Sequence, residues 1–365
     1  MDRREAIGWV QTVCSDLRAS QAKTLAHLVA AAMLAARVNL AEIGRRLVGV
    51  SAKHGIKRAW RFTDNRRIEI SDAMRGVVRR LLKRKRRKPL VIGFDWVEVR
   101  AFHTLSACAV IAGRAVPLVW ASYPEWELAK SQNNLEEGLL RLLRTMIPES
   151  IEVILLADRG FGRTELARLC QQLGFRYVVR IRPDVWVQTD RFRGKLADYP
   201  VKKGIRRLLR CGEYRRNNPV QQNVVVYWKR GLPLKRDECW FLMTDLERSA
   251  PALVKLYGQR MTIEQVFRDH KSRRNGFALR NTLVKKAERF DRLLLILAIA
   301  YLLLIGVGLF AKRHYCPSNW CTNTRAGECS VFLIGQRMLD QMELSPDQAL
   351  TAIQTALTAA APNWG

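Results

Sequence analysis

The sequence lacks closely spaced cysteines. Its eight cysteines are scattered, and no CxxC pair occurs, which excludes a disulfide-framed fold and indicates reduced thiols in a cytoplasm. The N-terminal segment has no long apolar run before a cleavage site, so we expect no secretory signal. Internal repeats and low-complexity segments are also absent. The composition, 48% hydrophobic and 26% charged, is that of a globular protein rather than a fibrous or disordered one.

Acidic residues are scarce relative to basic ones. Asp and Glu number 33 against 63 Lys and Arg, which gives a formal net charge of +30. A chain with this excess repels itself unless it meets a polyanion, and nucleic acid is the commonest polyanion in cells. An acidic membrane surface is the second candidate, and a merely basic soluble protein is the third.

One long apolar run could be either a membrane span or a buried helix of a soluble protein. Residues 293–311 carry no charge and follow Arg292. A run of this length can span a bilayer, but a central helix of a large domain is apolar on all sides too. Because the rest of the chain is polar and basic, the sequence favours a buried core helix.

Residues 1–88 are predicted to be helical and basic. Asn39 can cap a helix over Leu40–Leu47, and Ser51 can cap a second helix that ends near Phe62. The second helix carries four candidate DNA contacts: Lys53, Lys57, Arg58 and Arg61. This pattern indicates a helix-turn-helix unit, although an ordinary helical hairpin with a solvated basic face has the same pattern. The basic run Lys83–Lys88 is expected to be an interdomain junction that touches phosphates.

After Pro89 the pattern changes to alternating strands and helices. The predicted elements are strands 90–100, 105–111 and 115–122, helix 135–146, strand 151–157, helix 163–173 and strand 175–182. The order β-β-β-α-β-α-β predicts an α/β fold with a ribonuclease-H-like core, a mixed sheet flanked by helices. Residues 183–245 are expected to form an inserted β subdomain, and the chain after residue 330 is predicted to be helical.

Two aspartates stand at chemically informative places in this core. Asp95 interrupts an apolar strand, where a buried carboxylate is costly unless a cation compensates it. Asp158 follows the next buried strand, at the kind of strand end where ligands gather. Two acids at one sheet edge predict a site for Mg²⁺ or Mn²⁺, whereas either aspartate alone could equally be a helix cap or turn former.

A third acid lies in a regular basic context. Tyr257, Arg260, Glu264, Arg268 and Lys271 recur every three or four residues, which on one continuous helix forms a single stripe. One carboxylate among cations suits a metal-bound phosphodiester, because the cations can bind phosphate oxygens. The alternative is a solvated helix face on which Arg260 simply pairs with Glu264.

The spacing Y-x2-R-x3-E-x6-K, at Tyr257, Arg260, Glu264 and Lys271, resembles the YREK signature of bacterial insertion-sequence transposases, in the branch called insertion sequence family four. The apolar strand around Asp95, the Asp-Arg-Gly-Phe sequence that starts at Asp158 and the β insertion resemble that family too. The resemblance spans about residues 90–311. It implies a DDE transposase with a ribonuclease-H-like fold, and it implies that residues 293–311 form a packed helix rather than a membrane span.

The resemblance also implies a mechanism and partners. Asp95, Asp158 and Glu264 would be the catalytic, metal-holding acids, with Asp95 shared by two ions and Mg²⁺, or Mn²⁺ in its place, as cofactor. Arg260, Arg268, Lys271 and Tyr257 would contact the DNA backbone. The partners would be double-stranded DNA, as element ends and target, and a second protomer in a synaptic complex, in the bacterial cytoplasm and nucleoid. The expected division is an end-binding unit (1–88), a catalytic unit (89–315) and a C-terminal tail for protomer contacts (316–365).

Several alternatives stay open at this level. The tryptophans of the insertion, Trp186, Trp228 and Trp240, are either core residues or, as the resemblance allows, a platform for a flipped base. A zinc site at His314, Cys316, Cys321 and Cys329 is possible by residue type, but the spacing matches no common zinc module. The same three acids would also serve a DNA nuclease that does not join strands, or survive in a domesticated DNA-binding protein.

Overall fold

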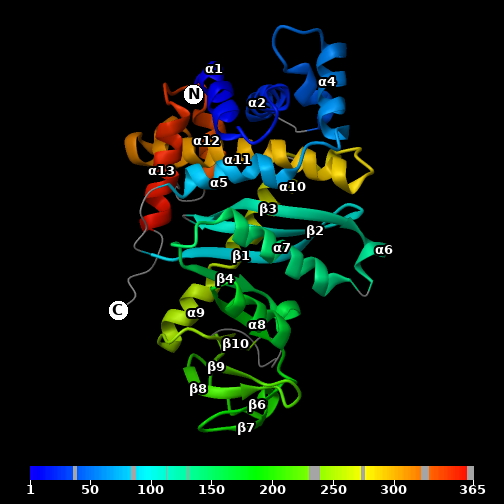
Figure 1. Ribbon diagram of the computed structural model, residues 1–365. Coiled ribbons are helices and arrows are strands. Elements are labelled where there is room, and N and C mark those ends of the chain that lie inside the picture. The colour runs from blue at the N-terminus through cyan, green and yellow to red at the C-terminus, as the bar shows by residue number, and fades with distance from the viewer. Residues whose placement is uncertain are drawn as a thin grey trace.

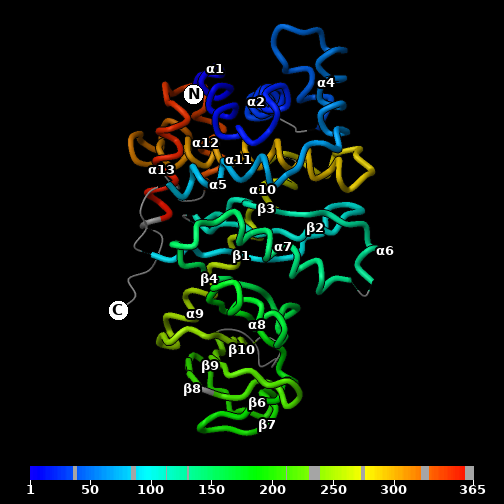
Figure 2. Tube along the Cα trace, in the orientation of Figure 1, coloured from blue at the N-terminus to red at the C-terminus, as the bar shows by residue number. Residues whose placement is uncertain are grey.

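The computed structural model describes residues 1–35, 39–83, 88–111, 113–129, 131–229, 239–272, 276–321 and 329–359. Figure 1 shows a helical layer stacked on one end of a β-sheet, with the strands of the other end of the sheet farthest from that layer. The trace in Figure 2 places the first and last helices of the chain together in the helical layer.

Among the described residues, ten strands form one mixed sheet in the order β3-β2-β1-β4-β5-β10-β9-β8-β6-β7. Strands β1, β4 and β5 run parallel, and β2 and β3 add antiparallel at one edge. The strands are β1 (Leu90–Val99), β2 (Phe102–Ile111), β3 (Arg114–Pro124), β4 (Val153–Ala157), β5 (Phe175–Ile181), β6 (Trp186–Gln188), β7 (Arg193–Lys195), β8 (Arg206–Tyr214), β9 (Val220–Tyr227) and β10 (Trp240–Thr244). The predicted mixed sheet flanked by helices is confirmed.

The predicted insertion, residues 183–245, is β-structured in its described part, but it does not form a separate sheet. Strand β10 pairs antiparallel with β5, from Phe241 opposite Ile181 to Thr244 opposite Val178. Strands β9, β8, β6 and β7 follow outward from β10. An unpaired β5 would expose its backbone N–H and C=O groups, and this pairing satisfies them. The insertion therefore extends the central sheet beyond β5.

Side chains of β1 alternate between two faces of the sheet, and different helices cover each face. Val91 packs with residues of α9 (Ala250–Gly258), and Gly93 faces α10 (Met261–Lys271). Ile92 and Phe94 point the other way, into the core that contains leucines of α7 (Gln132–Met146) and α8 (Thr164–Gln172). The strand thus divides its side chains between an α9/α10 face and an α7/α8 face.

The long apolar run lies in α11 (Ala287–His314), which forms the centre of the helical layer (Figure 1). This helix is long and apolar enough to cross a membrane, but 89% of its most apolar window is buried inside the fold. It packs against α2 (Ala19–Met33), α5 (Ile70–Leu81), α12 (Val331–Met338) and α13 (Pro346–Ala359). The prediction of a packed core helix is confirmed.

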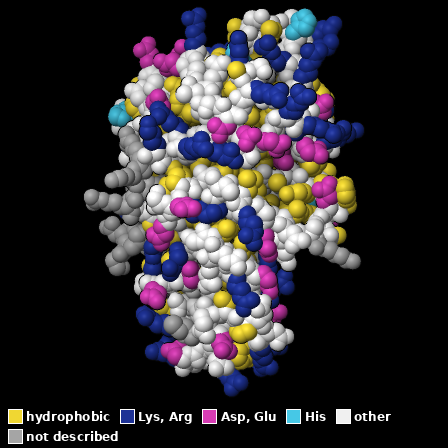
Figure 3. All heavy atoms as spheres, viewed as in Figure 1, with side chains coloured by type: hydrophobic (Ala, Val, Ile, Leu, Met, Phe, Trp, Pro, Cys, Tyr) yellow, Lys and Arg dark blue, Asp and Glu magenta, His cyan; other side chains and the backbone are white. Residues whose placement is uncertain are grey.

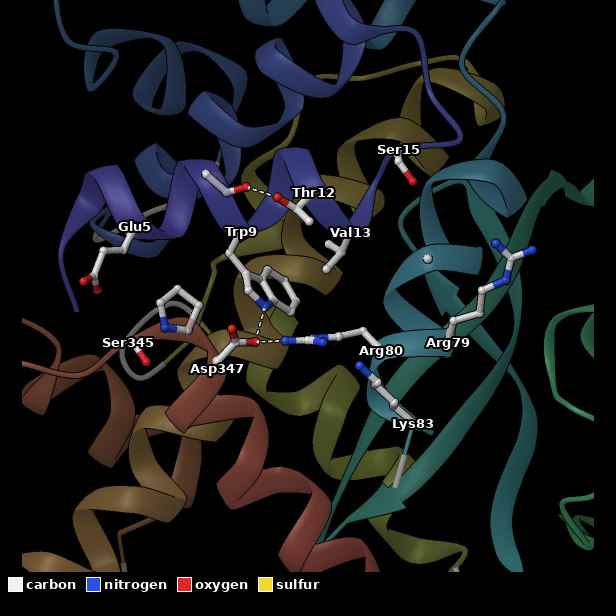
Figure 4. Close-up of a pocket in the computed structure, with 13 residues that line it drawn as sticks. Glu5, Trp9, Thr12, Val13, Ser15, Arg79, Arg80, Lys83, Ser345 and Asp347 are labelled. Atoms are coloured by element: carbon white, nitrogen blue, oxygen red, sulfur yellow. Dashed lines mark hydrogen bonds and ion pairs between the residues drawn. The ribbon is translucent and has the colours of Figure 1, made fainter. Parts of the chain in front are cut away.

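The C-terminal helix α13 docks on the N-terminal helices of the same chain. Its Asp347 accepts hydrogen bonds from Trp9 Nε1 on α1 (Arg3–Val13) at 3.2 Å and from Arg80 on α5 at 2.7 Å. Figure 4 shows both side chains pointing at this carboxylate, beside a cavity of about 730 Å³. The predicted helical tail is therefore present and packed intramolecularly, while its use in protomer contacts stays a prediction.

The two helices predicted to follow Asn39 and Ser51 are α3 (Leu40–Arg45) and α4 (Ala52–Asp64). Asn39 caps α3 as expected, because its side chain accepts a hydrogen bond from the backbone N–H of Glu42 at 2.8 Å. Gly44 and Gly55 bring the two backbones so close that a Cβ at Gly55 would lie 2.1 Å from the Gly44 carbonyl oxygen. Most of the predicted basic junction, residues 84–87, lies outside the described residues.

One carboxylate near the start of α11 gives the fold a pH dependence. Asp291 accepts a hydrogen bond from the Ser122 backbone N–H at 3.1 Å, and burial raises its pKa to about 7. Because the folded chain holds this proton more tightly than the unfolded chain does, the contribution of Asp291 to stability falls as the pH rises from about 4 to about 7.

We expect Asp291→Asn to remove that loss, since an amide oxygen can still accept the Ser122 hydrogen bond without ionising. The melting temperature of the variant should gain on that of the wild type between about pH 5 and about pH 8. Thermal unfolding of both proteins at the two pH values checks this. An equal difference at both values would show that Asp291 does not titrate in this window.

Candidate active site

Strand alternation and register bring the first two acids together. Asp95 follows Val91 and Gly93 onto the α9/α10 face, where its side chain is 18% exposed. Strands β1 and β4 are parallel, with Phe94 opposite Ala157, so Asp95 and Asp158 are the next residues on neighbouring strands. Neighbouring strands lie about 4.8 Å apart. The two predicted acids therefore lie at the same edge of the sheet.

The segment 257–271 is not the single helix that the sequence predicted. Helix α9 ends at Gly258, and α10 begins at Met261. Between them, Gln259 and Arg260 donate backbone hydrogen bonds three residues back, to Leu256 and Tyr257. Glycine weakens a helix at the point where the chain turns. The five predicted residues consequently belong to two helices and the turn between them.

Tyr257 lies on α9 and points into the fold. Its side chain is 2% exposed, its ring packs edge-on against Trp240 with 4.9 Å between centroids, and its hydroxyl lies 3.4 Å from Asp158 Oδ1. Burial raises the pKa of this hydroxyl, which stays protonated at neutral pH. Tyr257 is thus placed to donate a hydrogen bond to Asp158.

Arg260 joins two of the acids across the site. One guanidinium nitrogen lies 2.7 Å from Asp95 Oδ2 and the other 3.2 Å from Glu264 Oε1. The arginine side chain is 9% exposed, whereas that of Glu264 is 44% exposed. The interpretation of Arg260–Glu264 as an ordinary pair on a solvated helix face is therefore wrong, because Arg260 is buried and its shortest contact is with Asp95.

Close packing of α10 on β1 makes this bridge possible. A Cβ at Gly93 would lie 2.1 Å from Cδ1 of Ile263, the residue before Glu264. The absence of a side chain at position 93 lets Ile263 reach the strand backbone, and the first turn of α10 follows. Gly93 thus sets the distance from which Glu264 approaches Asp95.

The pKa of Asp95 is shifted by burial and by the charged groups around it at this edge of the sheet. This pKa is raised to about 6, mainly by burial; the charge of Arg260 lowers it, and the charges of Asp158 and Glu264 raise it. The charges of both other acids therefore act on Asp95. Three carboxylates with one buried guanidinium leave a surplus of negative charge that a further cation would neutralise.

The donor set suits a hard divalent cation. Carboxylate oxygens are the ligands that Mg²⁺ and Mn²⁺ prefer, and the raised pKa of Asp95 shows that its anionic form lacks full compensation. In the described part of the chain, no group of three His, Cys, Asp or Glu side chains lies close enough to hold a metal ion. This holds for the zinc candidates His314, Cys316, Cys321 and Cys329, and it holds for the three acids, where the guanidinium of Arg260 lies between Asp95 and Glu264. The acid trio thus fits Mg²⁺ in the type and charge of its ligands, while its present spacing is set by Arg260.

A cavity of about 1040 Å³ opens beside Asp95 and Glu264. Its basic lining residues are Arg100, Arg268, Lys271 and Arg280. Arg268 is exposed and Lys271 is half-buried; burial and the neighbouring charge of Arg280 lower the pKa of Lys271. The sequence analysis found two of these four cations. Arg100 and Arg280 were missed because no regular spacing connects them to the acids.

Glu136 is a buried acid that the sequence analysis also missed. It lies on α7, is 1% exposed, and accepts a hydrogen bond from Trp96 Nε1 at 2.8 Å. Its other carboxylate oxygen contacts the guanidinium of Arg163. Trp96 directly follows Asp95, and Arg163 ends the short loop that Asp158 begins. One carboxylate thereby anchors both segments that carry the paired aspartates.

We expect Glu136→Gln to raise the Mg²⁺ concentration needed for half-maximal DNA cleavage. The amide still accepts the Trp96 hydrogen bond, but it removes the carboxylate charge that pairs with buried Arg163, and breaking a buried ion pair typically costs about 3–5 kcal/mol. A metal titration of the cleavage rate measures this shift. Glu137→Gln is the matched control, because Glu137 lies 3.9 Å from the same arginine and is 31% exposed. Equal metal requirements in the two variants would contradict the positioning role.

The N-terminal candidates lie apart from this site. Lys53, Lys57, Arg58 and Arg61 are all exposed on α4, at the far side of the helical layer from the sheet (Figure 1). Three of them, with His54, line a groove of about 630 Å³. Figure 3 shows Lys and Arg side chains gathered over this corner of the molecule. The cations that line the cavity beside the acids and the cations of α4 thus form two separate basic regions.

The tryptophans of the insertion differ in their surroundings. Trp228 is 6% exposed and belongs to the core, and Trp240 packs against Tyr257. Trp186 is half-buried and carries the guanidinium of Arg216 over its ring, 5.0 Å from the centroid. Trp228 therefore fits the core interpretation, whereas Trp186 borders a groove.

Acids at the edge of a mixed sheet, beside a cavity rimmed with arginine and lysine, are suited to reactions of phosphodiesters. A family model described as a transposase DDE domain matches residues 86–303, which is more than half of the chain. The chain belongs to the DDE transposases, and this membership indicates a DNA-cleaving phosphoryl-transfer enzyme. A search of curated proteins gave no match.

Proposed function

We propose that the chain is an insertion-sequence transposase of the family four branch, which binds the terminal inverted repeats of its element and cuts and joins DNA strands there. The observation that carries the proposal is the contact of Arg260 with both Asp95 and Glu264, beside Asp158 on the neighbouring strand. This contact unites residues from β1 and the start of α10, which are more than 160 positions apart, in one site.

In this proposal Asp95, Asp158 and Glu264 hold divalent ions, Mg²⁺ or Mn²⁺. When bound, such ions activate a nucleophile and stabilise charge on the phosphoryl oxygens. Tyr257 orients the Asp158 carboxylate through its hydroxyl, because its burial keeps the side chain away from solvent. This role replaces the direct DNA contact expected from the sequence.

The cations around the cavity are proposed to bind the DNA backbone. Arg268 and Lys271 line the cavity next to Glu264, where they can take phosphates that flank the reacting one. Arg260 balances the acids and reaches the scissile phosphate from between them. In these assignments the residues of α10 and the turn before it position the DNA strand, and the rest of the 257–271 segment does not.

The α4 cations are proposed to bind the element end away from the catalytic site. Their separation from the acids suits a protein that holds a terminal repeat at one place and cuts it at another. Joining two ends requires two protomers, so we propose a homodimer on paired ends, in the bacterial cytoplasm. Binding should weaken with salt, by about 0.9 in the log–log slope for each neutralised phosphate.

Incubation of the purified protein with duplexes that copy its own element ends tests the proposal. With Mg²⁺ we expect strand cleavage at the end and joining to a second duplex, and with a chelator we expect neither. Cleavage without joining would support the nuclease alternative. Binding without cleavage would support a domesticated DNA-binding protein.

A further inference from the structure

A second basic groove, distinct from the cavity beside Asp95 and Glu264, lies on the other side of Asp158. It has a volume of about 670 Å³, and its lining includes Arg159, Arg182, Trp186, Arg215 and Arg216. Arg159 directly follows Asp158, and Arg182 directly follows β5. We name this feature the insertion groove, because the remaining three residues belong to the inserted strands and their turn.

The insertion groove carries positive charge that the fold does not neutralise. Arg159, Arg182 and Arg216 are exposed, and among the described residues none of the three forms an ion pair. The acids in the lining are Glu165 and Asp184. A groove with a surplus of free guanidinium groups attracts an anion with several charges.

Two of the arginines are held in place before any ligand arrives. Arg215 adopts a positive φ of 68° and donates a hydrogen bond to the Gly162 carbonyl at 3.0 Å. Arg216 lies over the Trp186 ring. Side chains that are already fixed lose less rotamer entropy on binding. This arrangement favours a ligand-binding role over a loose, solvated charge cluster.

The position of the groove determines which part of a DNA strand can reach it. The sheet order places β1, β4 and β5 side by side and parallel, so their carboxyl ends carry Asp95, Asp158 and Arg182 in succession. Neighbouring strands lie about 4.8 Å apart. The cavity lined by Arg268 and Lys271 therefore lies on the β1 side of the acid pair, and the insertion groove lies on the β5 side.

We propose that the insertion groove binds the phosphates of the donor DNA that flanks the element, across the cut from the transposon end. The inference rests on the proposed function, in which Lys271 and Arg268 bind phosphates next to the reacting one, and it takes their side of the site as the transposon side. A DNA strand that passes over Asp95 and Asp158 must leave the site on the β5 side, where Arg182 and Arg216 can contact its phosphates. Target DNA shares this chemistry, and the test separates the two sources.

The test compares two duplexes that copy the same element end, one with about ten base pairs of donor flank and one cut flush at the end. Fluorescence anisotropy in Ca²⁺, which limits cleavage, measures both dissociation constants over a range of salt. The wild type should bind the flanked duplex more tightly. Arg182→Ala/Arg216→Ala should weaken flanked binding about tenfold or more, reduce its salt slope by about 1–2, and leave flush binding unchanged.

The double variant Lys312→Ala/Arg313→Ala is the matched control, because it removes two exposed cations at the end of α11. It should keep the preference for the flanked duplex. Equal losses on flanked and flush duplexes, or no loss on either, would overturn the inference. A loss confined to capture of target duplex by the cleaved complex would assign the groove to target DNA instead and also overturn it. A wild type that prefers neither duplex over unrelated DNA would refute the proposed function itself.

Discussion

Asp95→Asn, Asp158→Asn and Glu264→Gln are each expected to abolish DNA cleavage while end binding stays close to that of the wild type. Each change keeps the side-chain shape but removes one negative charge from the trio, in which Asp158 and Glu264 both act electrostatically on Asp95. In each variant, a hard divalent cation at the site would lose one carboxylate ligand together with its negative charge. Gel analysis of end cleavage, with a parallel gel-shift titration, measures the two effects separately.

Glu125→Gln provides the matched control, because Glu125 is an exposed acid on α6 (Glu125–Leu128). It should cleave like the wild type. Full cleavage by any one of the three acid variants would remove that residue from the proposed site. Loss of end binding together with cleavage would show that the residue supports the fold or the DNA contact rather than the chemistry.

Arg260→Ala is expected to have the second-largest effect, on stability and on cleavage together. The variant leaves Asp95, with its side chain 18% exposed, without its cationic partner, and removing one partner of a buried ion pair typically costs about 3–5 kcal/mol. Because Mg²⁺ can supply the missing positive charge, it should raise the melting temperature of Arg260→Ala more than that of the wild type. Thermal unfolding with and without Mg²⁺ measures this difference.

Arg268→Ala is the control for Arg260, since Arg268 lies on α10, the helix directly after the turn that holds Arg260, but is exposed. It should unfold like the wild type and weaken only the binding of DNA. If Arg260→Ala unfolded at the wild-type temperature, the bridge between Asp95 and Glu264 would contribute nothing to the folded state. Cleavage at the wild-type rate by the same variant would also exclude a role for Arg260 at the scissile phosphate.

The strands and the paired aspartates could be predicted because their signals are local. An apolar run interrupted by one acid, and another run that ends in one, place Asp95 and Asp158 without knowledge of distant contacts. Parallel pairing of β1 with β4 then brings them together. The helix caps at Asn39 and the packed apolar helix were predictable for the same reason.

Features that depend on distant pairing could not be predicted. The turn at Gln259 and Arg260 places Tyr257 against Trp240, a contact between α9 and β10 that helical spacing does not reveal. Glu136 meets Arg163 across 27 positions, and the pairing of β10 with β5 joins segments about 60 residues apart. Each of these contacts decides the final geometry of the site, and none leaves a periodic pattern in the sequence.

Binding of Mn²⁺ to the purified protein, followed by electron paramagnetic resonance, tests most directly whether the three acids form one metal site. The wild type is expected to bind Mn²⁺, and Asp95→Asn, Asp158→Asn and Glu264→Gln should each weaken that binding, while Glu125→Gln should not. Competition by Mg²⁺ should displace the bound Mn²⁺. Equal Mn²⁺ binding by the wild type and all three acid variants would contradict the assignment of these residues as the metal-holding acids of this DDE transposase.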